Sequence, residues 1–567
     1  MNHRTAVRPW IRFSLTVAAA GVAAATSQGC FLFPTYCDEM MADSGGQGGN
    51  NVVPAADANR AILEADIVQI VDDRLYALSS TAGLNVIDLS VPGELTLLDQ
   101  ADSALGQPFE MYVLDGRVVA LADAAEGDHH SSVQIFDVTD PTDIRFTGGE
   151  AVAGHVSDSR IVGDVLYLVT HEDHVCSGCN PDPTTTIASF RFGEGSAITK
   201  VDELSYQQPD VQNRGWKRSV MVTTERMYVA GVAWDGWSEE GHSTIQVIDI
   251  SDPEGDLVEG TQVEAAGQIL NRWQMDEREG VLRVVSQPGV WSTADVPTVQ
   301  TFGIESAQLL EPMASVDLTL PTPESLRSVR FDGDRAYAIT AQAPEPYDPT
   351  AGADVELPQP PVDSCGPNCD PLIVIDLSDA WEPVQLGELE MPGWVFHMEP
   401  RGNRLMALGF ESTYPLGPLS VSLFDVADGA APKLVERVTF GGQWAGLAED
   451  QNRIHKAFTI VDELGLILVP YGWWGWEEDL QCSEFEGCDG DTYTSCWDSG
   501  DWARRGAVQL IDFTTDTLVA RGQANLDSWA LRAMIHDQSL LAVSDDEVSR
   551  FDVTDRDQPS EDANLVF

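Results

Sequence analysis

Apolar and polar residues alternate along most of the chain in short segments that end in an aspartate flanked by apolar residues. Leu84–Asp88 and Val133–Asp137 are examples, and their two-residue period is typical of a half-buried β-strand. Nine segments of this build follow one another at intervals of 40 to 87 residues, although two of them lack the aspartate. The other seven copies end at Arg191, Asp249, Gly303, Asp376, Asp425, Asp512 and Asp552.

A second apolar strand precedes each copy, as at Arg74–Leu78 and Arg117–Leu121, and is entered through a tight turn such as Asp115-Gly116. One further strand precedes the turn and another follows the copy, so each unit has four antiparallel strands. Repeated units of this kind predict an all-β fold, a β-propeller of four-stranded blades. We count nine units and favour eight blades, because propellers usually have four to eight, with nine blades as the alternative. Tandem β-sandwiches are the alternative, but no linker is visible between units after residue 62.

Five segments resemble the bacterial secreted β-propeller-domain proteins, a family distantly related to WD40 repeats. They are Glu64–Val68, Asn271–Val284, Val329–Tyr337, Asp370–Asp379 and Ile454–Thr459. The resemblance runs from about residue 62 to about residue 555. It implies export and a propeller fold, and it provides no catalytic motif to transfer.

The N-terminus has the layout of an export signal. Residues 1–29 combine three arginines and no acid with the apolar run Phe13–Ala25, which is too short to span a bilayer. Cys30 follows a small residue and resembles the lipidated cysteine of a bacterial lipoprotein, although Ser27 stands where that pattern prefers leucine. The alternative is cleavage near Ala25, with Cys30 in a disulfide.

Residues 30–62 are rich in glycine and polar residues and predict a flexible tether, which leaves residues 63–567 as the propeller. The expected location is a bacterial outer membrane or cell surface through the lipid anchor, and otherwise the periplasm or the medium. The chain has 91 acidic against 32 basic residues, a net charge of -59. This charge argues against nucleic acids as partners and favours a solvated acidic surface.

Long connections between the second and third strands of most units predict one functional face. In a blade with strands A to D from the axis outward, the B–C and D–A connections lie on one side and the A–B and C–D connections on the other. The B–C connections carry more than half of the 15 tryptophans, which suits a protein or glycan partner; the alternative is that these rings pack the loops together. The residues are Trp234, Trp237, Trp291, Trp473, Trp474, Trp476, Trp497 and Trp502.

Eight cysteines besides Cys30 predict disulfides in an exported chain. They are Cys37, Cys176, Cys179, Cys365, Cys369, Cys482, Cys488 and Cys496. The simplest pairing joins Cys176 to Cys179, Cys365 to Cys369, Cys482 to Cys488, and Cys496 to Cys37, but the sequence does not fix the connectivity. A less favoured alternative is a structural Zn²⁺ site formed by His171, His174, Cys176 and Cys179.

Two further groups could bind metal or catalyse. Clustered carboxylates in the eighth unit are of the type that Ca²⁺ takes, namely Asp489, Asp491, Asp498 and Asp501. Four histidines lie in or beside predicted innermost strands and could face the central channel, namely His155, His397, His455 and His536. A histidine in such a strand is more often hydrogen-bonded within its blade.

These observations favour a cell-envelope, lipid-anchored β-propeller that acts as a protein- or glycan-binding or scaffolding module through its B–C face. The alternative is an extracytoplasmic metal-dependent hydrolase or lyase that uses channel histidines or loop carboxylates. The sequence contains no GxSxG, Walker or HExxH motif, so the binding module is preferred.

Overall fold

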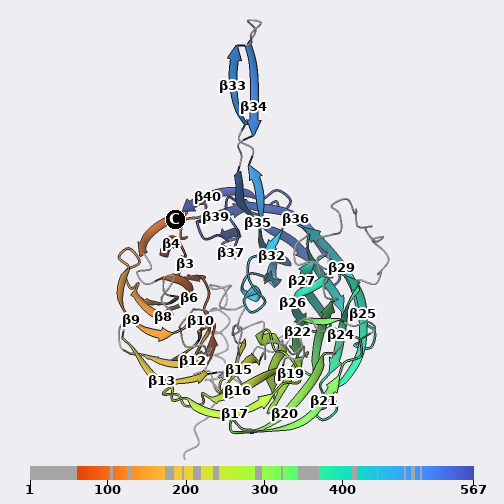
Figure 1. Ribbon diagram of the computed structural model, residues 1–567. Helices are drawn as coiled ribbons and strands as arrows, with labels where there is room; N and C mark the ends of the chain where they lie inside the picture. The colour runs from red at the N-terminus through yellow and green to blue at the C-terminus, as the bar shows by residue number, and fades with distance from the viewer. Residues whose placement is uncertain are drawn as a thin grey trace, which may run out of the picture.

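Nine β-sheets are arranged in a ring in the computed structural model (Figure 1). The structure describes residues 61–101, 106–123, 130–172, 184–193, 197–207, 219–233, 242–287, 296–320, 324–341, 369–411, 418–442, 445–477, 480–486, 492–498 and 501–567. Each sheet is one blade, numbered 1 to 9 in chain order. No helix in this described part is long and apolar enough to span a bilayer, and the predicted signal and Cys30 lie outside it.

The strands follow the chain from the axis outward in every blade. Blades 1 to 3 are β2 (Val68–Val71), β3 (Arg74–Ser79), β4 (Gly83–Asp88) and β5 (Thr96–Ala101); β6 (Gln107–Leu114), β7 (Arg117–Asp123), β8 (His130–Asp137) and β9 (Arg145–Ala153); β10 (His155–Val162), β11 (Val165–Glu172), β12 (Thr184–Phe192) and β13 (Ile198–Gln207). Blades 4 to 6 are β14 (Ser219–Val222), β15 (Arg226–Ala233), β16 (His242–Asp249) and β17 (Val258–Glu264); β18 (Met275–Arg278), β19 (Val281–Ser286), β20 (Thr298–Ser306) and β21 (Leu309–Asp317); β22 (Ser325–Asp332), β23 (Arg335–Ala341), β24 (Cys369–Asp376) and β25 (Val384–Pro392).

Blade 7 is β26 (Trp394–Arg401), β27 (Arg404–Phe410), β28 (Leu419–Asp425) and β29 (Lys433–Phe440). In blade 8 two short inner strands, β30 (Gly446–Leu447) and β31 (Thr459–Val461), pair with β32 (Leu466–Glu477), followed by β35 (Asp501–Phe513) and β36 (Leu518–Leu526). In the sequence, the hairpin of β33 (Leu480–Glu486) and β34 (Thr492–Asp498) connects β32 to β35, which pair directly with each other. Blade 9 is β37 (Arg532–His536), β38 (Ser539–Val543), β39 (Glu547–Asp552) and β40 (Ser560–Val566).

The nine counted units are confirmed, and the preference for eight blades was wrong. The last unit has a complete fourth strand, β40, so it forms a blade of its own. Apolar side chains of neighbouring blades share common clusters, as blades 1 and 2 do through Val86, Met111 and Val118. This continuous packing excludes separate tandem sandwiches, because each sheet buries its faces against its neighbours.

The repeated aspartate forms the turn between the third and fourth strands. Asp88 lies opposite Arg74 in the register of β3 and β4, and its carboxylate accepts the backbone N–H of Ser90 at 2.9 Å. The same turn recurs at Asp249, whose carboxylate accepts the N–H of Ser251 at 2.9 Å. Hydrogen bonds from Ser90 lower the pKa of Asp88 below its usual value. The motif is therefore a repeated Asx turn, which sets the C–D connection.

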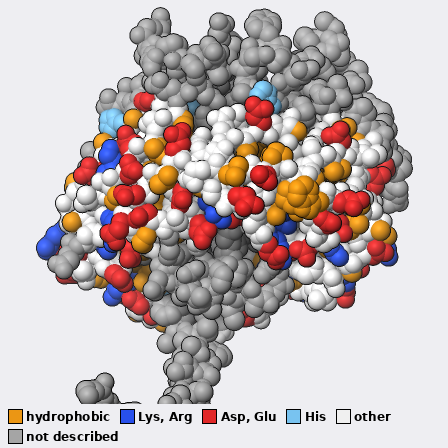
Figure 2. Space-filling view, turned by 90° about the horizontal axis from the view of Figure 1, so that it is seen from below, with side chains coloured by type: hydrophobic (Ala, Val, Ile, Leu, Met, Phe, Trp, Pro, Cys, Tyr) orange, Lys and Arg blue, Asp and Glu red, His pale blue; other side chains and the backbone are white. Residues whose placement is uncertain are grey.

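The second and third strands of each blade are buried on both faces, whereas the outermost strands face solvent. Leu75 and Val86 in blade 1 are fully buried, while most of β5 is exposed or half-buried. Figure 2 shows acidic side chains spread over the outer wall of the ring, with fewer basic ones among them. The predicted solvated acidic surface is present on this wall.

The ring closes without exchange of a strand between the first and last blades among the described residues. All strands of blade 1 come from the N-terminal end of the ring and all those of blade 9 from its C-terminal end. An apolar cluster joins the two blades, with Leu541 and Val543 packed against Leu75 and Ile87. The N–H of Ser80 also donates to the carboxylate of Asp545 at 2.7 Å.

The N-terminal residues 61–66 form a strap along the inner strands of blades 2 and 3. β1 (Ile62–Leu63) pairs with β10, and Asp66 bridges to Met111 of β6. Gly163, in the A–B turn of blade 3, donates its N–H to the carbonyl of Ala61 at 3.1 Å. The chain therefore enters the ring on the A–B side, and β1 begins one residue inside the predicted tether.

We expect Leu541→Ala to destabilise the protein by about 2–5 kcal/mol, because Leu541 is fully buried where the ring closes. Leu309→Ala is the matched control: Leu309 is 50% exposed on β21, so its loss should change stability by no more than about 0.5 kcal/mol. Urea unfolding followed by tryptophan fluorescence measures both. Equal effects of the two substitutions would contradict closure by this apolar cluster.

Candidate functional site

An excursion from blade 8 fills the centre of the ring. Residues 448–458, here called the axial segment, connect β30 to β31 and include the short 3₁₀ helix η4 (Ile454–Lys456). The Gln451 side-chain amide donates to the carbonyls of Arg327 at 2.9 Å and Phe396 at 3.0 Å, in blades 6 and 7. Asn452 accepts the N–H of Arg272 at 3.1 Å, at the entry to blade 5. The axial segment therefore ties together blades that lie on different sides of the channel.

Glu64 of the strap is the centre of an ion cluster at the axis. Its carboxylate lies 3.2 Å from a guanidinium nitrogen of Arg160, 2.9 Å from Nη1 of Arg272 and 2.9 Å from Nε2 of His455. Burial alone would raise the pKa of Glu64, but the attraction of Arg160 and His455 outweighs it and lowers that pKa far below the usual range. Glu64 is therefore ionised and joins the strap, blade 3, blade 5 and the axial segment.

Two further ion groups extend the cluster around the channel. Glu110 of β6 lies 2.7 Å from Nζ of Lys456 and 3.0 Å from Nε of Arg453. Arg532 of β37 lies 2.8 Å from Asp66 and 2.8 Å from Glu449. Burial raises the pKa of Glu110, although the two cations oppose this shift. These contacts connect the axial segment to blade 2, to blade 9 and to the strap.

Trp273 occupies the middle of the cluster and was missed by the sequence reasoning. Its ring lies under the guanidinium groups of Arg272, at 4.3 Å, and Arg330, at 4.1 Å. The rings of His397 and His455 meet it edge-on, at centroid distances of 5.9 and 5.3 Å. Its indole N–H donates to the Gln451 carbonyl at 2.7 Å. The sequence signal that could have pointed to Trp273 is the capping pair Asn271 and Gln274. This pair closes the short 3₁₀ helix η3 (Arg272–Gln274), in which Trp273 lies.

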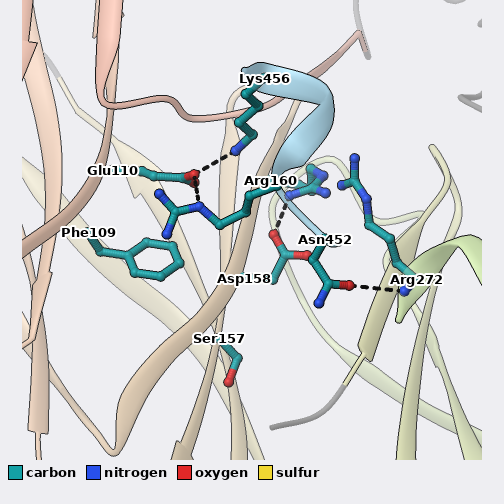
Figure 3. Close-up of a pocket in the computed structure, with 9 residues that line it drawn as sticks. Phe109, Glu110, Ser157, Asp158, Arg160, Arg272, Asn452 and Lys456 are labelled. Carbon is teal, nitrogen blue, oxygen red and sulfur yellow. Dashed lines mark hydrogen bonds and ion pairs between the residues drawn. The ribbon is translucent and has the colours of Figure 1, made fainter. Parts of the chain in front are cut away.

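A small pocket lies beside the axial segment (Figure 3). The space that it encloses is about 10 Å³, enough for about one water molecule. The lining residues are Phe109, Glu110, Ser157, Asp158, Arg160, Arg272, Asn452, Arg453 and Lys456. Glu110 and Asp158 lie in the first halves of the inner strands β6 and β10, so the pocket lies toward the end of the channel where the D–A and B–C connections lie.

The structure brings two of the four predicted channel histidines together. His397 and His455 share the cluster around Trp273, and burial lowers the pKa of each, that of His455 to about 4. His155 begins β10 with 45% of its side chain exposed, and Nδ1 lies 3.9 Å from Asp123. His536 ends β37 and lies 3.2 Å from Asp73 of blade 1. His155 and His536 therefore lie apart from the group of contacts around Glu64 and Trp273, here called the axial cluster.

Two of the eight predicted face tryptophans have described side chains. Trp473 packs against the core of blades 7 and 8, with its ring 5.6 Å from that of Tyr471. Trp474 is 47% exposed, and the guanidinium of Arg504 lies 5.3 Å from its ring. Trp476, Trp497 and Trp502 lie on β32, β34 and β35, whereas Trp234, Trp237 and Trp291 lie outside the described residues.

Most predicted disulfide and metal residues lie outside the described part of the chain. This is so for Cys37, Cys176, Cys179, Cys365, Cys488, His174, Asp489 and Asp491. His171 is buried on β11, with Nδ1 3.3 Å from the Thr185 hydroxyl. In the hairpin register Cys496, rather than Cys488, is the cross-strand neighbour of Cys482. Cys369 begins β24, Asp498 ends β34 and Asp501 begins β35.

The model of a protein family described as Beta propeller domain matches residues 59–347 and 367–556 of this chain. The chain belongs to this family. The match confirms the predicted propeller family, while bacterial export and the relationship to WD40 repeats remain predictions.

Two archaeal relatives are uncharacterised proteins. One from Methanocaldococcus jannaschii is 30% identical over 235 residues, which cover 41% of this chain and 31% of the relative. One from Archaeoglobus fulgidus is 26% identical over 207 residues, 36% of this chain and 27% of the relative. The chain thus spans about a third of the length of these relatives or less.

Solved propellers resemble the chain at low identity. The periplasmic gluconolactonase PpgL of Pseudomonas aeruginosa is 11% identical, with a TM-score of 0.33 and coverage of 67% of this chain and 92% of that one. Hsv2p of Kluyveromyces lactis is 10% identical, with a TM-score of 0.33 and coverage of 66% and 99%. At these identities the likeness concerns the fold alone.

We expect His455→Gln to flatten the loss of stability between about pH 6.5 and pH 4. Because burial lowers the pKa of His455 to about 4, the unfolded chain takes up this proton at a higher pH than the folded protein. The free energy of unfolding therefore falls as the pH falls through this window, and the substitution removes this contribution. Urea unfolding at several pH values measures the slope. The control is His130→Gln, at an exposed position on β8, and an unchanged slope for His455→Gln would contradict the prediction.

Proposed function

We propose that this protein is exported, anchored through a lipid on Cys30, and binds a protein or glycan partner in the cell envelope or outside the cell. The observation that carries the proposal is an arm built from blade 8. β32 and β35 have 12 and 13 residues and continue past the blade, and the hairpin β33–β34 lies well beyond the rim of the ring (Figure 1). The arm presents the exposed indole of Trp474, which offers a large apolar area and one donor.

The position of the strap supports an orientation in which the B–C connections face away from the membrane. Ala61 leaves the ring at the A–B turn of blade 3, whereas the arm arises from the B–C connection of blade 8. A tether that reaches Cys30 from Ala61 would therefore leave the A–B side toward the membrane. The B–C connections would then face away from the membrane, where a partner can reach them.

The contacts of the axial cluster favour a binding role, because they make the ring a rigid platform for its loops. Ion pairs and hydrogen bonds of the axial segment hold blades 2, 5, 6, 7 and 9 to one another through the channel. A rigid ring positions its loops with little loss of conformational freedom on binding. His397 and His455, on which the enzyme alternative depends, are buried in this cluster and do not line the pocket. Their surroundings favour a structural role.

We expect Trp474→Ala to weaken partner binding by about tenfold or more, since an exposed indole at a binding site often dominates the affinity. Trp381→Ala is the matched control, because Trp381 is 67% exposed in the C–D connection of blade 6 on the opposite side. Both proteins are titrated against glycan arrays and against purified envelope fractions. Equal binding by wild type and Trp474→Ala, or equal loss in both variants, would contradict the proposal.

Metabolic labelling with a fatty acid tests the anchor, and Cys30→Ser must abolish the label.

A further inference from the structure

Two A–B turns meet where the last blade of the ring joins the first. Asp73 lies in the turn between β2 and β3 of blade 1, and Asp537 follows His536 in the turn between β37 and β38 of blade 9. Nε2 of His536 lies 3.2 Å from Oδ1 of Asp73, and its Nδ1 lies 4.0 Å from Oδ2 of Asp537. One imidazole therefore lies between carboxylates of two different blades.

The three side chains have ligand atoms to offer. One such atom from each residue lies within 4.8 Å of the other two. His536 has only 11% of its side chain exposed, and its Nδ1 is buried with no hydrogen-bond partner among the described residues. Asp73 and Asp537 are each 62% exposed, and within the described part of the chain no arginine or lysine is ion-paired with either carboxylate.

The charge of this group favours a cation. Two carboxylates face a single imidazole, and Arg74, which follows Asp73 directly, interacts with Tyr76 and Asp88. The whole chain has a net charge of -59, which raises the local concentration of cations at its surface. A bound divalent cation would therefore offset repulsion between the two turns.

The donor atoms indicate which kind of cation fits. Carboxylates alone suit Mg²⁺ or Ca²⁺, whereas imidazole suits Zn²⁺ and other transition metals, so one imidazole with two carboxylates favours the latter. Zinc bonds of about 2.0–2.2 Å require the three ligand atoms to lie closer together than they do here. Both carboxylates are exposed on turns and are free to rotate toward Nδ1 of His536. Water would complete the coordination.

We propose that Asp73, His536 and Asp537 bind a divalent transition-metal ion such as Zn²⁺, which joins blade 9 to blade 1. Among the described residues these blades exchange no strand, and the apolar cluster of Leu541 and Leu75 joins them in the core. The ion adds a second connection, at the A–B edge of the same junction. Because 463 residues separate Asp73 from His536, the ion binds the closed ring in preference to the unfolded chain and stabilises it. The site is independent of partner binding at the arm of blade 8.

The test is zinc binding to the full mature chain, measured by equilibrium dialysis with elemental analysis and by urea unfolding at increasing Zn²⁺ concentration. We expect the wild type to bind Zn²⁺ with a dissociation constant of about 10 µM or tighter and its unfolding midpoint to rise. His536→Gln and Asp537→Asn should each lose one bound equivalent and this rise. Asparagine tolerates the left-handed backbone of Asp537, where φ is 46°, so Asp537→Asn keeps the turn.

Matched variants away from the junction are the controls. Asp115→Asn removes an exposed carboxylate from the A–B turn of blade 2, and His130→Gln removes an exposed imidazole from β8. Both should keep the wild-type stoichiometry and the rise in midpoint, which separates this site from zinc bound elsewhere on an acidic chain.

The proposal is overturned if Zn²⁺ does not raise the unfolding midpoint of the wild type. It is also overturned if correctly folded His536→Gln and Asp537→Asn proteins bind and respond to Zn²⁺ like wild type. Loss of an equivalent in Asp537→Asn but not in His536→Gln would contradict it too, because the imidazole would then not be a ligand.

Discussion

The ionised carboxylate of Glu64 is the contact on which the centre of this propeller depends. It is the point where the N-terminal strap, the inner strand of blade 3, the entry to blade 5 and the axial segment meet. A ring of nine blades surrounds a wider channel than a ring of fewer blades, and this channel has to be filled if the inner strands are to be buried. The chain fills it with β1 and the axial segment, and both are held by ion pairs.

Charge is distributed differently in the channel and on the outer wall. The wall is covered with acidic side chains, whereas the channel matches arginine and lysine with nearby carboxylates, as in the Arg330–Glu399 and Arg532–Asp66 pairs. Attraction to Arg330 and His397 outweighs burial and lowers the pKa of Glu399 to about 2. Buried ion pairs add little net stability but are costly to break, so they favour one arrangement of the strap and the axial segment over others.

The repeat could be predicted from the sequence because it is local. Alternation of apolar residues identified the strands, and the recurring aspartate identified the turn that Asp88 and Asp249 form. The expectation of eight blades failed because it relied on the usual size of propellers rather than on the ninth unit, whose outer strand is complete. The alternation of apolar residues did not indicate that residues 61–66 pair with the inner strands of blades 2 and 3.

The axial cluster could be predicted only in part. His397 and His455 were expected at the channel because they lie beside predicted inner strands. Glu64 was not linked to His455, because 391 residues separate them and the pairing depends on how nine blades close into a ring. Trp273 was missed for the same reason, because its distant partners come from the axial segment and from blades 6 and 7. Local periodicity specifies which residues belong to an inner strand, and it contains no information about which residue lies across the axis.

The most direct test of this account is hydrogen exchange, measured by mass spectrometry, on the wild-type protein and the Glu64→Gln variant. Glu203→Gln, on the exposed outer strand β13, is the control for loss of one carboxylate. If Glu64 holds the centre together, its substitution will speed amide exchange in residues 61–66 and in the axial segment, while the outer strands keep their protection. Unchanged exchange in the axial segment of Glu64→Gln would contradict the account.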